Sequence, residues 1–135
     1  QMLFYSNSSV SGKSVISHPH VGLDVIPADG NVSNPDIQSI GYGLVLDIHN
    51  EVDTSAGRYI DVDYGFGLVV RYCHLNQIYI TKNGPISAGT IIAQMGNSST
   101  LKQGGQPLGT HLHITFFTNY NNKTHTNPLN YLSLP

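Results

Sequence analysis

Two histidines separated by one leucine, His111 and His113, stand just before the β-branched and aromatic run "ITFF". Residues two apart on a β-strand point to the same face, so both imidazoles are predicted to project into one place from a rigid element. Imidazole is a common metal ligand and, with an ordinary pKa of about 6.5, it also carries protons at physiological pH. The pair therefore indicates two metal ligands, or one ligand beside one acid–base group. A pair of ordinary surface or core histidines is the competing interpretation.

A second fragment, "HVGLD", places His20 four residues before Asp24. Imidazole nitrogens and carboxylate oxygens are both zinc ligands. On one straight strand these two side chains would lie about 13 Å apart, so a shared metal requires a bend, which Gly22 permits. A loop histidine and a turn-capping aspartate is the simpler interpretation of this fragment alone. His18, in "HPH", is an alternative group that would approach the metal or the substrate.

A third fragment, "RYCHLN", ends a predicted strand with His74. Strand alternation places His74 on the face of Tyr72 and Cys73 on the opposite face. Cys73 is the only cysteine, so an internal disulfide is excluded. Nothing near Cys73 in the sequence would lower its pKa, and we predict a small buried residue rather than a nucleophile. A Cys–His hydrolase is the alternative that this fragment leaves open.

Together the fragments define a possible catalytic site. His20, Asp24 and one histidine of the pair make a three-ligand zinc set with one open position, which is the catalytic pattern rather than the structural one. The other member of the pair and His74 then remain for proton transfer. The base is predicted to be one of these histidines, unless Asp61 or Asp63 intervenes.

These groups must be positioned by short strands, because β-branched runs alternate with glycine- and proline-rich turns along the chain. The predicted strands are "VGLDVI", "LVLDIH", "YIDVD", "LVVRYCHL", "IYI", "TIIAQM" and "HLHITFF". No amphipathic helix longer than two turns is predicted. Two segments are predicted to be long loops, 35–57, with its own candidate strand "GLVLDIH", and 96–109. The fold class is therefore all-β.

Composition narrows the class further. The 135 residues suit a single domain, and we expect residues 1–135 to be one catalytic domain excised from a longer protein. The net charge of −2 and the absence of a basic patch argue against a nucleic-acid partner. No apolar run approaches the roughly 20 residues of a membrane span. Glu51 is the only glutamate, which excludes a zinc site of the HExxH type.

Five fragments in chain order carry a resemblance to a known family. They are "HVGLDVIPADGNV", "YIDVDYGFGLVVRYCHL", "IYITKNGPISAGTIIAQMGNSS", "GTHLHI" and "TNPLNYL". They resemble, respectively, a first metal motif, paired strands closing with Tyr-x-His-Leu, a glycine-punctuated strand pair, a closing His-Leu-His motif and a terminal Asn-Pro. From about His18 to Leu132, this set is similar to the lysostaphin/LytM-type zinc metallopeptidases, which cleave peptide bonds in bacterial peptidoglycan.

The resemblance implies roles for five residues. It implies one zinc ion (Zn2+) held by His20, Asp24 and His113, and catalytic roles for His74 and His111. It also implies an antiparallel β-sheet core with a loop-walled active-site groove.

The sequence departs from the family pattern in places. Thr110 stands where the family usually has proline, and Thr115 where it often has glutamate. The segments 36–57 and 101–108 are enlarged. Loops shape a binding groove, so substrate preference does not carry over from the family.

The resemblance also implies a partner and a location. The partner would be bacterial peptidoglycan, and the location extracellular or at the cell wall, as a secreted enzyme, a bacteriocin or a part of a phage virion. We expect a monomeric domain within a larger chain. The alternative is a non-catalytic module of the same fold that binds cell wall or activates another hydrolase.

Overall fold

The computed structural model describes residues 15–18, 22–26, 34–103, 105–107 and 109–127. Within these residues the regular elements are all strands, and no helix is long and apolar enough to cross a membrane. The strands are β1 (Val15–His18), β2 (Gly22–Val25), β3 (Asp36–Gln38), β4 (Gly43–His49), β5 (Tyr59–Asp63), β6 (Val69–Cys73), β7 (Leu75–Ile78), β8 (Pro85–Ile86), β9 (Ile91–Met95), β10 (Lys102–Gln103), β11 (Gln106–Pro107), β12 (Leu112–Asn119) and β13 (Thr124–Thr126). The predicted all-β class is confirmed.

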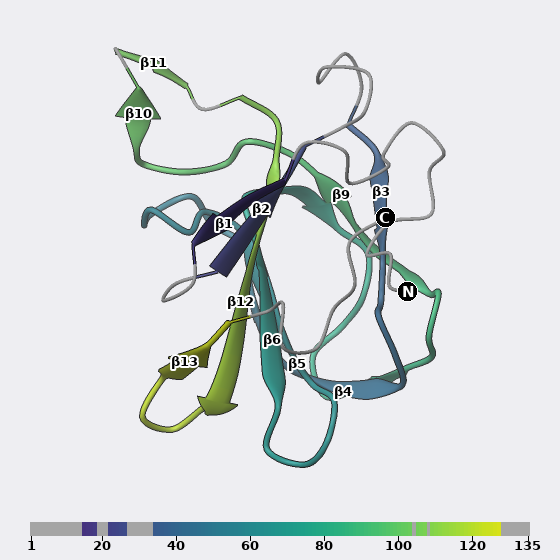
Figure 1. Cartoon of the computed structure of the whole chain (residues 1–135). Coiled ribbons are helices and arrows are strands. Elements are labelled where there is room, and N and C mark those ends of the chain that lie inside the picture. The colour runs from purple at the N-terminus through teal and green to yellow at the C-terminus, as the bar shows by residue number, and fades with distance from the viewer. Residues whose placement is uncertain (1–14, 19–21, 27–33, 104, 108, 128–135) are drawn as a thin grey trace.

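The described strands form three antiparallel sheets (Figure 1). The largest has eight strands in the order β1-β2-β12-β6-β5-β4-β8, with β13 added on β12. A three-stranded sheet has the order β3-β9-β7, and β10 and β11 form a hairpin of their own. Strand β12, which carries His113, lies between β2 and β6. Strand β2 carries Asp24, and His74 follows directly after β6.

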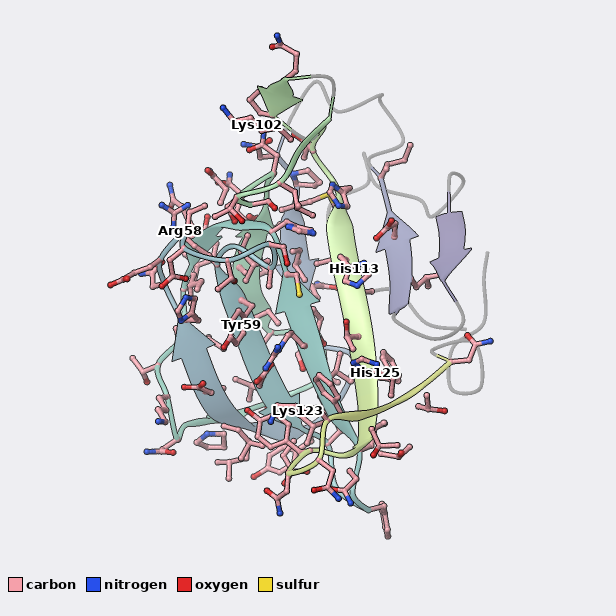
Figure 2. All side chains as sticks on the ribbon, turned by 90° about the vertical axis from the view of Figure 1, so that its left-hand side faces the viewer. Arg58, Tyr59, Lys102, His113, Lys123 and His125 are labelled. Atoms are coloured by element: carbon pink, nitrogen blue, oxygen red, sulfur yellow. The ribbon has the colours of Figure 1, made fainter. Side chains whose placement is uncertain are left out.

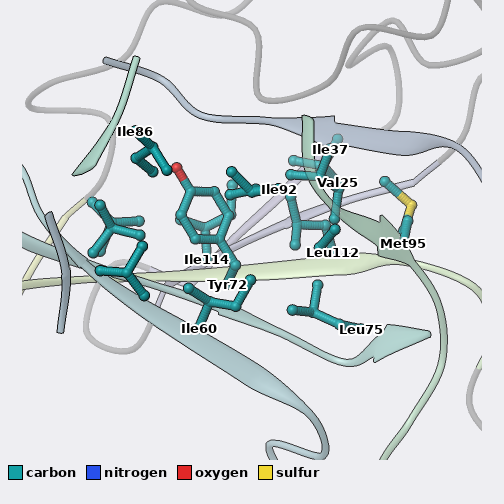
Figure 3. Packing of buried hydrophobic residues seen from close by; sticks show 14 of the residues in the cluster. Val25, Ile37, Ile60, Tyr72, Leu75, Ile86, Ile92, Met95, Leu112 and Ile114 are labelled. Carbon is teal, nitrogen blue, oxygen red and sulfur yellow. The ribbon is translucent and has the colours of Figure 1, made fainter. Parts of the chain in front are cut away.

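The hydrophobic core lies between the inner face of the large sheet and the three-stranded sheet (Figure 3). Alternation along β12 buries Leu112, Ile114 and Phe116 on this inner face. The opposite wall of the core includes Ile37 of β3 and Met95 of β9, both without solvent exposure. Each such side chain contributes about 1.5–3 kcal/mol by leaving water, which holds the two sheets together.

The outer face of the large sheet carries the intervening residues of the same strands, and Figure 2 looks onto it with His113 near its centre. His113 on β12 is in register with Asp24 of β2 on one side and with Cys73 of β6 on the other. The core therefore sets the register, and the register places the polar groups of three strands next to one another.

The predicted strands match the observed ones unevenly. "YIDVD" is β5 in full and "GLVLDIH" is β4 in full, but of "IYI" only Ile78 belongs to a strand. The segment 35–57 was predicted to be a long loop, and it contains the additional strand β3. Strand β3 forms because Ile37 is fully buried and pairs with Ala93 of β9. The segment 96–109 holds the β10–β11 hairpin.

Candidate metal and catalytic site

Strands β2 and β12 bring two of the predicted metal ligands together. Asp24 Oδ1 lies 2.6 Å from His113 Nδ1. The close approach depends on Gly22, where a Cβ atom would lie only 2.3 Å from the Ile114 carbonyl oxygen and 2.8 Å from His113 Nε2. The φ angle of +151° at Gly22 is also one that side-chain-bearing residues rarely adopt. Gly22 thus allows β2 to lie directly against His113, in addition to the bend that its sequence position suggested.

The chemistry of this pair suits a zinc ion. A carboxylate oxygen only accepts, so in this contact His113 Nδ1–H donates the hydrogen bond to Asp24. Both atoms are of the kinds that bind zinc, and both side chains are about one-fifth exposed, at 19% and 20%, so an ion can reach them. The third predicted ligand, His20, lies outside the described residues. Among the residues that are described, no group of three or more histidine, cysteine, aspartate or glutamate side chains forms a metal cage.

His74 occupies the corner between β6 and β7. Alternation predicted that it would share a face with Tyr72, and that prediction is wrong. His74 has a φ of +64°, so the chain leaves the strand geometry after Cys73 and the ring turns to the outer face. Its ring centroid lies 4.5 Å from that of His111 and 6.0 Å from that of His113. The left-handed backbone at one residue therefore moves this histidine from the core side to the predicted metal ligands.

A hydrogen bond fixes the orientation of the buried His74 ring. Its Nδ1 lies 2.8 Å from the Ser98 carbonyl oxygen, which can only accept, so Nδ1 carries the hydrogen and Nε2 has a free lone pair. Burial lowers the pKa of His74 to about 4, with the Ser98 hydrogen bond opposing that change and the nearby His111 and His113 adding to it. At neutral pH the ring is therefore uncharged, and Nε2 is able to accept a proton.

His111 precedes β12 and forms an isolated bridge with Gly96, to whose carbonyl its backbone N–H donates at 3.0 Å. Its Nδ1 lies 2.8 Å from the Gly109 carbonyl oxygen. The carbonyl oxygen can only accept, so Nδ1–H is the donor and Nε2 is the ring nitrogen that points away from this hydrogen bond. The rings of His111 and His113 both lie beside the His74 ring, with centroid distances of 4.5 and 6.0 Å. The two histidines differ in partner, because one contacts a carbonyl and the other a carboxylate.

Cys73 is buried, as predicted, at 3% exposure. Burial raises the pKa of its thiol to about 12, with Arg71 opposing and Asp61 reinforcing the change. The thiol is therefore protonated at neutral pH and lacks the thiolate that a nucleophile requires. This environment argues against the Cys–His hydrolase.

The two aspartates considered as alternative bases have other roles. Asp61 is fully buried and receives two hydrogen bonds from Arg71, at 2.8 and 2.9 Å, and one from the Tyr120 hydroxyl at 2.6 Å. Asp63 accepts a hydrogen bond from the backbone N–H of Gly65 at 2.8 Å in the β5–β6 turn. Both carboxylates are engaged in holding the sheet and its turn, which argues against either of them as the base.

Sequence reasoning missed one residue that contributes to the site. Ser98 contacts the His74 ring through a backbone carbonyl. Every residue has a carbonyl, so the sequence contains no signal for this contact. Only the long-range packing of the segment after β9 against the β6–β7 corner reveals it.

The antiparallel β fold thus brings the rings of His74, His111 and His113 together near Asp24. The profile of peptidase family M23 matches residues 18–128, and the chain belongs to this family. The resemblance to lysostaphin/LytM-type peptidases is thereby confirmed. At the level of sequence, no curated protein is a significant match.

Solved structures share the fold. The catalytic domain of EnpA, a prophage-encoded M23 protein from Enterococcus faecalis crystallised in a mutant form, is similar with a TM-score of 0.70, 18% identity and coverage of 97% of this chain and 92% of that one. A zinc-containing peptidase from Vibrio cholerae has a TM-score of 0.70 at 19% identity, over 100% of this chain and 41% of that one. The catalytic domain of lysostaphin from Staphylococcus simulans has a TM-score of 0.66 at 17% identity, over 97% and 88%. At such identities the likeness establishes the fold alone.

Proposed function

We propose that the protein is a zinc-dependent endopeptidase that hydrolyses peptide bonds in the cross-bridges or stem peptides of bacterial peptidoglycan. The observation that carries the proposal is the placement of His74 and His111, each bonded through Nδ1 to a backbone carbonyl, beside the contact between Asp24 and His113. Membership of peptidase family M23 supports the same reaction class.

The metal would be held by His20, Asp24 and His113. One oxygen donor, on Asp24, and one nitrogen donor, on His113, already face each other, and His20 is implied by the resemblance of "HVGLD" to the family's first metal motif. When bound, zinc supplies Lewis acidity and makes water a nucleophile near neutral pH. With three protein ligands, the ion would still be able to bind a water molecule or a substrate group.

His74 and His111 would divide the proton transfer. One Nε2 takes the proton of the attacking water, and the other imidazole orients that water or donates to the developing oxyanion. Both rings are held at Nδ1 by backbone carbonyls, so each presents Nε2 in a fixed direction. A fixed direction reduces the reorganisation needed during the reaction.

The setting follows from the substrate. Peptidoglycan lies outside the cytoplasmic membrane, so the protein would act extracellularly or at the cell wall. Two of the structurally similar proteins, an antimicrobial peptidase and a prophage-encoded protein, fit a role against another cell's wall. We propose a monomeric domain of a larger chain, released as a bacteriocin, a secreted enzyme or a virion component.

The test combines zinc content with the loss of turbidity of a cell-wall suspension. We expect one zinc per chain and lysis by the wild-type protein. His74→Ala should retain zinc and lose lysis, because it removes a proton carrier and no ligand. His125→Ala is the matched control, since His125 is an exposed histidine on β13 away from the site, and it should retain both properties.

Two results would contradict this proposal. A full lytic rate for His74→Ala would remove His74 from the mechanism. A purified wild-type protein without zinc and without lysis on several wall types would favour the non-catalytic cell-wall-binding or hydrolase-activating module.

A further inference from the structure

Ser98 lies where three segments meet: the loop before β5, the β6–β7 corner and the chain after β9. The backbone N–H of Leu75 donates to the Arg58 carbonyl at 3.0 Å. In a regular antiparallel pair, Arg58 N–H would donate back to the Leu75 carbonyl. Here Arg58 N–H donates to Ser98 Oγ at 3.0 Å, and the Ser98 hydroxyl donates to the Leu75 carbonyl at 2.7 Å. The Ser98 hydroxyl thus lies between Arg58 N–H and the Leu75 carbonyl, and it replaces their direct hydrogen bond with two hydrogen bonds of its own.

The other polar end of the same residue contacts the site. The Ser98 carbonyl accepts the hydrogen bond from His74 Nδ1. The Gly57 backbone also packs closely against this carbonyl, because a Cβ atom on Gly57 would lie only 2.0 Å from the Ser98 carbonyl oxygen. Gly57 has a φ of +65° and is buried, so backbone packs on backbone at this point. The Ser98 hydroxyl and the Gly57 backbone therefore determine where the carbonyl acceptor of His74 lies.

We propose that Ser98 is a positioning residue for His74, whose hydroxyl holds the carbonyl that keeps Nδ1 protonated and Nε2 directed at the site. These two hydrogen bonds need one atom that accepts from an N–H and donates to a C=O, which at this size only serine and threonine hydroxyls provide. Alanine would leave Arg58 N–H and the Leu75 carbonyl without these partners. The catalytic consequence rests on the proposed function, whereas the effect on the imidazole does not.

The first experiment reads the tautomer of His74 directly, in metal-free protein labelled with 15N-histidine. Long-range 1H–15N correlation spectra at neutral pH should show the wild-type His74 ring with hydrogen on Nδ1 and a free Nε2. Ser98→Ala should lose this signature by mixing the two tautomers. Ser98→Thr, which keeps the hydroxyl, should retain it.

The second experiment measures hydrolysis by the zinc-loaded proteins. Ser98→Ala should lower kcat about 10- to 100-fold, the usual effect of losing a group that orients a site histidine, with KM and zinc content unchanged. Ser98→Thr should restore kcat. Ser99→Ala is the matched control, because the Ser99 hydroxyl donates to the Ser55 carbonyl at 2.7 Å and accepts from Leu101 N–H at 3.0 Å. It removes an equally bonded hydroxyl and should leave kcat and the His74 spectrum unchanged.

The outcomes separate the two proposals. A wild-type His74 that carries its hydrogen on Nε2, or a Ser98→Ala protein with wild-type spectrum and kcat, overturns the positioning role. A wild-type protein without hydrolysis, whose His74 signature still depends on Ser98, overturns the proposed function and supports the positioning role. If Ser98→Ala does not fold, Ser98→Thr decides, since loss of its signature and its kcat would overturn the inference and retention of both would support it.

Discussion

Gly22→Ala should separate the two metal-ligand strands. The added Cβ would lie 2.3 Å from the Ile114 carbonyl oxygen, whereas ordinary contact begins at 3.4 Å. Since the obstacle is backbone, β2 must shift by about 1 Å, and metal–ligand distances tolerate only about 0.2 Å. Asp24 moves with β2 away from His113. We expect zinc affinity to fall at least about 10- to 100-fold.

The same change should also lower stability. A side chain at a φ of +151° costs about 1–3 kcal/mol, and the steric overlap costs about another 1–3 kcal/mol. Competition with a chromophoric chelator measures the zinc affinity, and urea unfolding of the metal-free protein measures the stability. Gly89→Ala is the control, because Gly89 has a φ of +82° but no atom within 4 Å of an added Cβ. It should lose about 1 kcal/mol and no zinc affinity.

The reasoning is refuted if Gly22→Ala binds zinc as tightly as the wild-type protein while remaining folded. That result would mean that β2 and β12 do not need to lie this close for Asp24 and His113 to share an ion. Equal losses of zinc affinity in the Gly22→Ala and Gly89→Ala proteins would refute it too, because general destabilisation would then explain the effect.

Three further predictions concern the outer face of the sheet. His111→Ala should keep zinc and lose lysis, whereas His113→Ala should lose both, as metal analysis and turbidity assays would show; loss of zinc from His111→Ala would reverse the two roles. Arg71→Met should lower the free energy of unfolding by about 3–5 kcal/mol, because it leaves the buried carboxylate of Asp61 without two charge-assisted hydrogen bonds. A loss below about 1 kcal/mol in urea would contradict this account. Cys73 should resist iodoacetamide at neutral pH until the protein unfolds, because its pKa is raised to about 12, and rapid alkylation of the native protein would disprove the burial argument.

The strands were predicted best where the pattern is local. "YIDVD" and "GLVLDIH" could be read as strands because β-branched residues recur in short runs between turn signals. Strand β3 could not, since its three residues form a strand only through pairing with β9, more than fifty residues later. The predicted orientation of His74 was wrong for a related reason. Side chains alternate between the two faces only while the backbone stays extended, and the φ of +64° at His74 ends the extended backbone.

The sequence by itself determined which side chains are candidates for the site and that the fold is all-β. His111, His113, Asp24 and His74 were identified from residue type, spacing and motif order, which are properties of the chain alone. The tertiary structure decided which of these groups meet. Asp24 and His113 are 89 residues apart in sequence, and only strand register places them 2.6 Å apart. The tautomer of His74 depends on the Ser98 carbonyl, a group that every residue possesses, so only its position in space distinguishes it.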